Sequence, residues 1–117
     1  MPLVRVRHNA GMYESMLAEM GGLIAHLVAT NLSVEEEDGH LKESDIEVIF
    51  DEKKPYDRVK HDLLVDIEAY HYPSRHGNRQ ERVEQILAGI KSAYGGSVGV
   101  WLKIEAGAAW AESPATG

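Results

Sequence analysis

The sequence predicts an α+β fold in which two β-α-β units form one four-stranded sheet with two helices on one face. Three observations lead to this prediction. Apolar residues alternate in four short segments, they recur with helical spacing in two longer ones, and both halves of the chain show these segments in the same order. Two amphipathic helices can bury one face of such a sheet, which gives a core in two layers.

The four predicted strands show the period of two that is typical of half-buried strands. Val4 and Val6 alternate with arginines in residues 2–8, and the segments 45–50, 62–71 and 97–105 alternate in the same way. The opposite face carries both signs of charge, with Arg5, Arg7, Glu47, Asp66, Glu68, Trp101 and Lys103. This face is either solvated or shared between subunits, where opposite charges pair across strands.

Two helices are predicted from apolar residues spaced three and four apart. The first stripe runs from Met12 to Val28. The second helix begins at Asn78, which forms the pattern of a capping box with Glu81 three residues later. It ends before the two glycines at 95–96.

Length and composition indicate a single domain. We expect residues 1–60 to form the first β-α-β unit, residues 61–105 the second and residues 106–117 a C-terminal tail. A chain of 117 residues has an unfavourable ratio of surface to volume. Association with further copies would therefore help to bury apolar surface.

Charge and composition exclude several classes of protein. The net charge of −7 argues against non-specific binding of nucleic acid. The chain contains no cysteine, which excludes disulfides, thiolate metal sites and cysteine catalysis. No stretch approaches the roughly 18 apolar residues of a membrane span, and the N-terminus lacks the apolar segment of a signal peptide. We expect a cytoplasmic protein that binds neither nucleic acid nor membrane.

Metal and cofactor motifs are also missing from the sequence. His71 and His76 are five residues apart across a strand end, and no third ligand accompanies them, so no metal site is expected. There is no phosphate-binding loop and no dinucleotide motif, so no cofactor is expected.

The opening segment MPLVRVRH places Pro2 at the start of a strand. Methionine before a small residue such as proline is normally removed, which would expose a secondary amine. An α-amino group titrates near pH ~8, and burial beside cations such as Arg5 or Arg7 lowers the pKa towards that of a general base. Alternatively, Pro2 is a strand-edge residue that needs no N–H for the ladder.

The whole pattern resembles the tautomerase superfamily, in which Met-Pro, a short alternating strand and a loop into a helix open the chain. This superfamily includes 4-oxalocrotonate tautomerase, 5-carboxymethyl-2-hydroxymuconate isomerase, the malonate semialdehyde decarboxylases and macrophage migration inhibitory factor. The resemblance covers roughly residues 2–105. It implies a homotrimer in which Pro2 transfers a proton on a small 2-oxo or enol carboxylic acid. Decarboxylation or hydration of a related acid would use the same proline, with its amine protonated, and the same carboxylate-binding arginine.

The resemblance also implies an arginine that binds the substrate carboxylate, in a segment between the third strand and the second helix. The segment PSRHGNRQER supplies Arg75 and Arg79, whereas Asn78 stands after the glycine where the superfamily often has arginine. Either arginine is a candidate. Arg79 shares the azimuth of Val83 and Ile86, so we expect it to point towards the sheet at a helix N-terminus that favours anions.

Two aromatic residues complete the candidate site. Trp101 lies in the middle of the last strand and Tyr70 at the end of the third, where each is expected to line a pocket or a subunit contact. A second hypothesis remains open beside the enzyme. In it, the chain is a non-catalytic oligomeric β-α-β module of the same or a ferredoxin-like fold.

Overall fold

The computed structural model describes residues 2–35, 39–107, 109 and 111–114. Within these ranges it contains the strands β1 (Leu3–His8), β2 (Glu47–Glu52), β3 (Leu63–Tyr70) and β4 (Val98–Glu105), and the long helices α1 (Glu14–Leu32) and α3 (Arg79–Ala93). A short 3₁₀ helix, η2 (Glu43–Asp45), precedes β2, and a short helix, α2 (Pro73–Gly77), precedes α3. Met1, and residues 108, 110 and 115–117 of the expected tail, lie outside the described residues.

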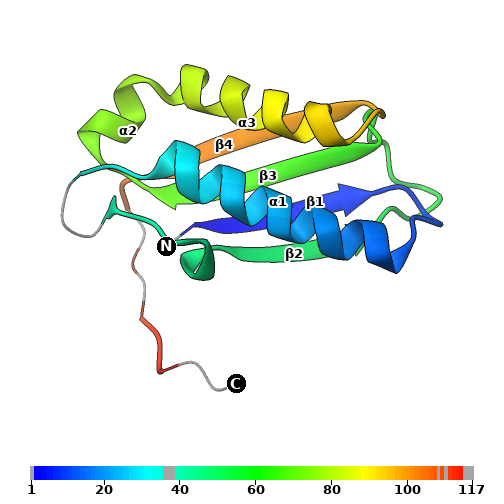
Figure 1. Cartoon of the computed structure of the whole chain (residues 1–117), viewed down its shortest axis with the longest axis horizontal. Coiled ribbons are helices and arrows are strands. Elements are labelled where there is room, and N and C mark those ends of the chain that lie inside the picture. Colours follow the sequence, from blue (N-terminus) through cyan, green and yellow to red (C-terminus); the bar gives the residue numbers. More distant parts are fainter. Residues whose placement is uncertain (1, 36–38, 108, 110, 115–117) are drawn as a thin grey trace.

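The strands form one mixed sheet in the order β2-β1-β3-β4. The pairs β1–β2 and β3–β4 are parallel, whereas the central pair β1–β3 is antiparallel. Each parallel pair is connected through a long helix, and both long helices cover the same face of the sheet (Figure 1). The predicted α+β fold with two β-α-β units is therefore confirmed.

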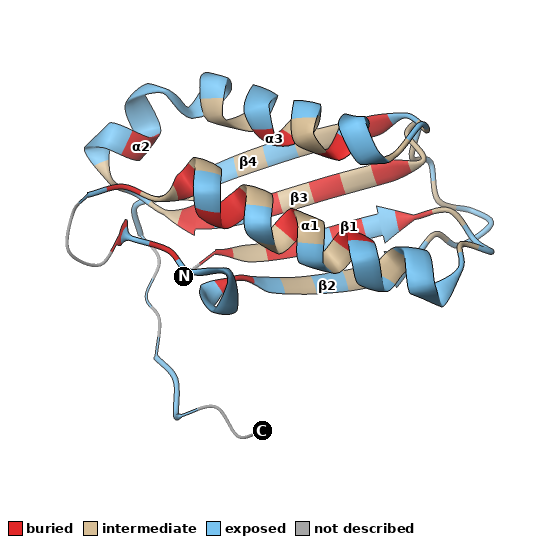
Figure 2. Cartoon of the chain, in the orientation of Figure 1, coloured by how far each residue is buried: buried red, intermediate tan, exposed pale blue. Residues whose placement is uncertain are grey.

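The core lies between the sheet and the two long helices. Every second residue of β1 and β3 is buried because these central strands have a neighbour on each side and helices above. Figure 2 shows the matching buried stripe on the sides of α1 and α3 that face the sheet. The main buried residues are Val4, Val6, Met20, Ile24, Val28, Leu32, Leu63, Val65, Ile67, Ala69, Ile86 and Ile90.

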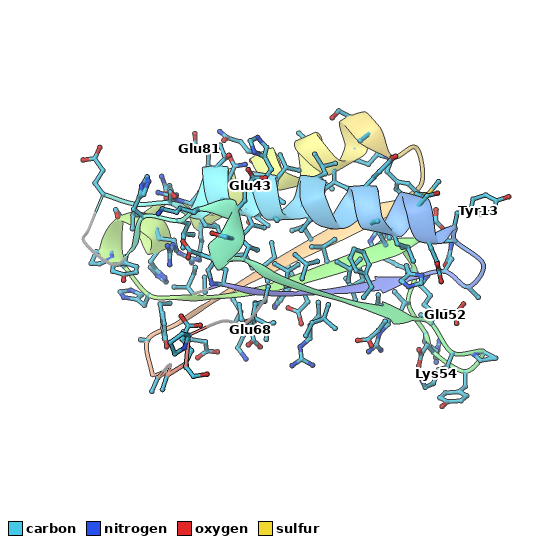
Figure 3. The ribbon with its side chains drawn as sticks, turned by 60° about the horizontal axis from the view of Figure 1, so that its bottom comes forward. Tyr13, Glu43, Glu52, Lys54, Glu68 and Glu81 are labelled. Carbon is cyan, nitrogen blue, oxygen red and sulfur yellow. The ribbon has the colours of Figure 1, made fainter. Side chains whose placement is uncertain are left out.

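The other face of the sheet is open in the single chain, and Glu68 projects from it on the side away from the helices (Figure 3). The seven residues predicted for this face are exposed, apart from Asp66, which is half-buried. Asp66 lies opposite Arg5 on β1 and opposite Trp101 on β4. Trp101 is 63% exposed, and Ile49 on the outer strand β2 is 45% exposed. The open face thus combines opposite charges with two accessible apolar side chains.

The second long helix begins where the sequence predicts, directly after Asn78, but its capping differs from the prediction. Asn78 makes no side-chain cap, and its Oδ1 instead accepts a hydrogen bond from Nε of Arg82 at 2.5 Å. The predicted capping box at Asn78 and Glu81 is therefore wrong. The reason is the unpredicted helix α2, which ends at Gly77 and leaves Asn78 with backbone angles of φ −121° and ψ 32°. An N-cap side chain needs an extended backbone instead.

Candidate functional site

Pro2 lies directly before β1, at the end of the sheet where β3 finishes. Its carbonyl oxygen accepts a hydrogen bond from the backbone N–H of Glu47 at 3.3 Å. The register pairs Leu3 with Glu68, so continuing it by one residue places Pro2 opposite Ala69. The proline is less than 2% exposed. Strand alternation puts it on the same side as Val4, which faces the helices.

Arg75 is buried inside the fold, whereas a residue that binds a ligand at the surface would be exposed. It is 1% exposed. Nε donates to the carbonyl of Leu32 at 2.8 Å, Nη1 to the carbonyl of Tyr70 at 2.8 Å and Nη2 to the carbonyl of Gly39 at 3.3 Å. The guanidinium also lies 5.0 Å from the centre of the Tyr72 ring.

These contacts make Arg75 a link between three segments that are far apart in the sequence. Leu32 is the last residue of α1. The carbonyl groups at the C-terminal end of a helix stabilise a nearby cation. Tyr70 is the last residue of β3, and Gly39 lies in the connection towards β2. The structure therefore assigns Arg75 a part in holding this end of the fold together. Its role as a carboxylate ligand stays a prediction.

Arg79 is the first residue of α3 and is exposed. The expectation that it points towards the sheet is wrong. Its Nη1 donates to the backbone carbonyl of His76 at 2.9 Å and lies 3.3 Å from Nε2 of the same histidine. The cause is again α2, whose last turn presents the carbonyl of His76. The rings of His76 and His71 are 5.2 Å apart, so Arg79 is part of an exposed basic group.

The two aromatic candidates, Tyr70 and Trp101, lie in different places in the structure. Tyr70 is half-buried at the end of β3, the end where Pro2 lies, and its carbonyl accepts from Arg75. Trp101 lies on the open face of the sheet, whereas Pro2 is on the helix side. The start of β1, the end of β3, α2 and the start of α3 lie at the same end of the molecule (Figure 1). These elements carry or adjoin Pro2, Tyr70, Arg75 and Arg79, whereas Trp101 lies on the open face of the sheet.

A polar network at the other end of the sheet was missed by sequence reasoning. Asp62 accepts hydrogen bonds from Nδ2 of Asn9 at 2.8 Å and from the backbone N–H of Ser97 at 2.9 Å. Lys53 donates to Oδ1 of Asn9 at 2.7 Å and to the carbonyl of His61. The backbone hydrogen bond from Ser97, followed by that from Asn9, holds the pKa of Asp62 below its usual value. No spacing rule signals this network, because its members come from three separate loops.

Two further properties concern the described part of the chain. Within it, no group of three or more histidine, aspartate or glutamate side chains is placed to hold a metal ion. None of its helices has the length and apolar character needed to cross a membrane.

Comparison with known proteins gives a structural result. No family model and no curated protein sequence matches the chain. Malonate semialdehyde decarboxylase is 12% identical with a TM-score of 0.69, over 97% of this chain and 92% of that one. A member of the cis-3-chloroacrylic acid dehalogenase family is 13% identical with a TM-score of 0.68, over 90% of this chain and 76% of that one. Both are tautomerase superfamily members. The chain has the fold of the tautomerase superfamily.

A third solved structure bears on assembly. A fused 4-oxalocrotonate tautomerase, solved as a symmetric trimer, is 12% identical with a TM-score of 0.67, over 89% of this chain and 85% of that one. At these identities the likeness shows the fold alone. Within the tautomerase fold, this chain places Pro2 directly before the first strand of the first β-α-β unit.

Proposed function

We propose that this protein is a tautomerase-type enzyme in which Pro2, freed by removal of Met1, transfers a proton on a small 2-oxo or enol carboxylic acid. The position of Pro2 is the observation that carries the proposal. In the fold of the tautomerase superfamily, it lies directly before β1, and in the chain that carries Met1 less than 2% of its surface is exposed. Removal of Met1 would turn the amide nitrogen of this proline into a secondary amine, whose direction the ring and the following strand fix.

The chemistry needs only the amine and the substrate. An amine that stays shielded from water after removal of Met1 has its protonated form disfavoured, which leaves its lone pair available as a general base. The nitrogen takes a proton from the carbon beside the oxo group, and the electrons of that C–H bond form the enolate. The same proton is then returned to the enolate oxygen. Protons and charge balance within the cycle, and the proposal includes no cofactor and no metal.

Arg79 is the better of the two arginine candidates for holding the carboxylate. The Nε, Nη1 and Nη2 atoms of Arg75 all donate to backbone carbonyls inside the fold. Arg79 is exposed and contacts His76 through Nη1. Its guanidinium is therefore accessible to a carboxylate, which it can bind with two parallel hydrogen bonds. Tyr70, at the same end of the fold, is proposed to line the pocket.

The active form is proposed to be a homotrimer assembled through the open face of the sheet. Opposite charges and the exposed side chains of Ile49 and Trp101 support an interface there. The similar fused 4-oxalocrotonate tautomerase is a symmetric trimer. In this assembly Trp101 is a subunit-contact residue.

A second reaction type is favoured by one comparison. The structures of malonate semialdehyde decarboxylase, which include a variant with alanine in place of its first proline, were solved to explain decarboxylase and hydratase activities. Decarboxylation of a 3-oxo acid by this chain would place a protonated Pro2 beside the developing carbanion. The pH dependence separates the two cases, because tautomerisation requires the neutral amine and decarboxylation the protonated one.

The test begins with the intact mass of the purified chain, which should lack Met1. Ketonisation of phenylenolpyruvate, followed by ultraviolet absorbance, then reports proton transfer. Pro2→Ala should lower the rate at least about a hundredfold, since the fixed ring nitrogen is replaced by a primary amine that rotates freely and is no longer positioned as a general base. Arg79→Met should mainly raise KM, whereas Arg58→Met, an exposed arginine in the loop before β3, should leave both constants unchanged.

Circular dichroism and urea unfolding of Pro2→Ala serve as the folding control. Wild-type turnover in a folded Pro2→Ala protein would refute the proline mechanism. A wild-type chain that has lost Met1 and turns over neither phenylenolpyruvate nor a 3-oxo acid would support the non-catalytic module instead.

A further inference from the structure

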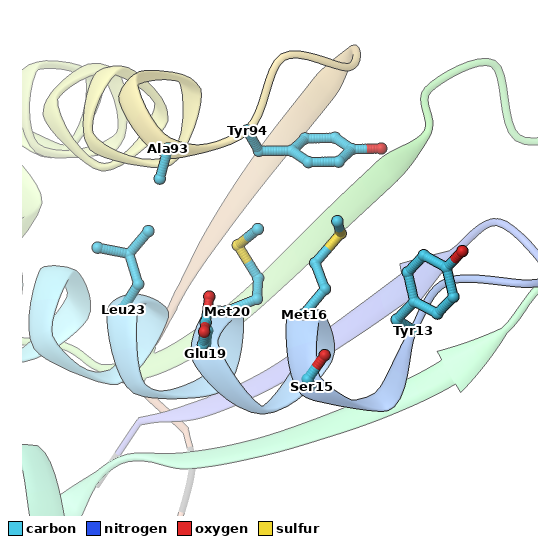
Figure 4. Close-up of a pocket in the computed structure, with 8 residues that line it drawn as sticks. All are labelled: Tyr13, Ser15, Met16, Glu19, Met20, Leu23, Ala93 and Tyr94. Carbon is cyan, nitrogen blue, oxygen red and sulfur yellow. The ribbon is translucent and has the colours of Figure 1, made fainter.

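A cavity of about 480 Å³ lies between the first half of α1 and the C-terminal end of α3. Figure 4 shows Met16, Met20 and Leu23 projecting from α1 towards Ala93 and Tyr94. Tyr13 closes one end of the row. Small-molecule sites usually have volumes of ~300–1,000 Å³, with mostly apolar walls and a few polar groups. The remaining lining residues, Ser15 and Glu19, supply such polar groups.

The cavity follows from the unequal lengths of the two helices. Helix α1 has 19 residues and α3 has 15, a difference of four residues or about one turn. The two helices run in opposite directions, so the first turns of α1 extend past the end of α3 (Figure 1). Apolar side chains there lack a full cover: Met20 is buried, but Met16 is 39% exposed and Tyr13 is 76% exposed.

This cavity is separate from the proposed proline site. Pro2 stands before β1, whereas α1 begins six residues after the far end of the same strand, at Glu14. The cavity is also on the helix side of the sheet, away from the open face that carries Trp101. Neither the proton transfer nor the trimer proposed above accounts for it.

The charge around the cavity favours a cation. Glu19 is the one charged side chain among the described residues that line it. Behind Tyr94, the absence of a side chain at Gly96 leaves room for the tyrosine hydroxyl and a carboxylate oxygen of Asp62, since a Cβ there would lie 2.6 Å from each. Burial, and secondarily the charge of Asp62, raises the pKa of Tyr94, so its phenol is neutral at physiological pH. Lys91 donates to the carbonyls of Gly95 and Gly96 and does not line the cavity.

The lining also suits an aromatic group attached to the cation. Aromatic rings attract cations through their faces. Methionine side chains adapt to apolar and aromatic groups and make favourable sulfur–aromatic contacts. The cavity therefore combines a carboxylate, two tyrosine rings and two methionines around one space.

We propose that this cavity binds a small aromatic ammonium compound, with its ring among Met16, Met20 and Leu23 and its ammonium group beside Glu19. Charge complementarity selects this occupant over an anion of the same shape. The site is a ligand-binding site distinct from the candidate active site.

The test compares two probes of similar shape and opposite charge on the full chain, followed by NMR amide shifts. With 2-phenylethylammonium we expect saturable shifts confined to the first half of α1 and to residues 93–94. The matched anion, 3-phenylpropanoate, should bind at least about fivefold more weakly, the scale of one exposed charge pair. Glu19→Gln should weaken the ammonium probe by about fivefold, whereas Glu68→Gln, on the open sheet face, should have no effect.

Ala93→Leu is a second variant, which fills the cavity from the exposed last residue of α3 and should abolish the shifts in a folded protein. Pro2→Ala should leave binding of the probe unchanged. Failure of the proline mechanism can therefore be distinguished from failure of the proposed ligand cavity. The proposal is overturned if the ammonium probe gives no saturable shifts up to roughly 10 mM, if both probes bind equally, or if Glu19→Gln binds as the wild type does.

Discussion

At the scale of single residues, the structure buries Arg75 and exposes Arg79, although both were candidates for the carboxylate. Helical spacing placed Arg79 towards the sheet, yet its guanidinium is exposed and contacts the carbonyl of His76. Arg75 is the arginine that enters the interior, where carbonyls of Leu32, Gly39 and Tyr70 accept its hydrogen bonds. The helix starts after Asn78 as predicted, but the spacing argument did not include α2, whose residue His76 offers a carbonyl to Nη1 of Arg79.

Replacement of Arg75 should be costly for folding. Arg75→Met keeps much of the side-chain length but removes the donors to three carbonyls, so we expect the free energy of unfolding to fall by about 3 kcal/mol. Urea unfolding followed by circular dichroism measures this change. The exposed Arg58→Met should change stability by no more than about 0.5 kcal/mol. Equal stability of the two variants would contradict the structural role of Arg75.

At the scale of elements, α1 contains two adjacent glycines in different surroundings. A Cβ at Gly22 would meet nothing within 4 Å, whereas a Cβ at Gly21 would lie 3.3 Å from Cε2 of Phe50. Gly22→Ala should therefore raise the free energy of unfolding by about 0.5–1 kcal/mol, because alanine is the better helix former. Gly21→Ala should gain less, since the ring must move. Thermal unfolding of both variants tests this difference, and an equal gain would show that the contact with Phe50 is unimportant.

The loops at the end of the sheet opposite Pro2 are connected through Asp62, which makes their stability depend on pH. Hydrogen bonds from Ser97 and Asn9 lower the pKa of Asp62 from its ordinary value of 3.8. The ionised carboxylate is thus favoured by folding. It contributes stability above that ordinary value, and the contribution is lost as the pH falls through the lowered pKa of the folded state.

Asp62→Asn should accordingly be less stable than the wild type at neutral pH, with a deficit that shrinks below about pH 3.8. Urea midpoints measured across this range provide the test. Glu112→Gln, at an exposed position after β4, controls for the loss of one negative charge elsewhere. A deficit that stays constant down to the lowest pH would show that ionisation of Asp62 is not its cause.

At the scale of the whole molecule, the open sheet face governs the proposed assembly. Trp101→Glu should raise the trimer dissociation constant by about thirtyfold or more, because a large aromatic side chain at an interface is replaced by a charge. Native mass spectrometry and sedimentation measure the distribution of species. Tyr56→Glu is the matched control, since this tyrosine is 76% exposed in the loop between β2 and β3. A wild-type monomer, or a trimer unaffected by Trp101→Glu, would contradict assembly through this face.

The sequence by itself determined the fold class, because the alternation in β1 and β3 and the helical spacing in α1 and α3 are local consequences of which face each element buries. The residues of the open face, Arg5 and Trp101 among them, followed from the same alternation. Tertiary structure alone decided the partners of Arg75, the direction of Arg79 and the cavity beside Glu19. Each depends on carbonyls or helix ends that are distant in sequence, and no local period encodes where such groups meet.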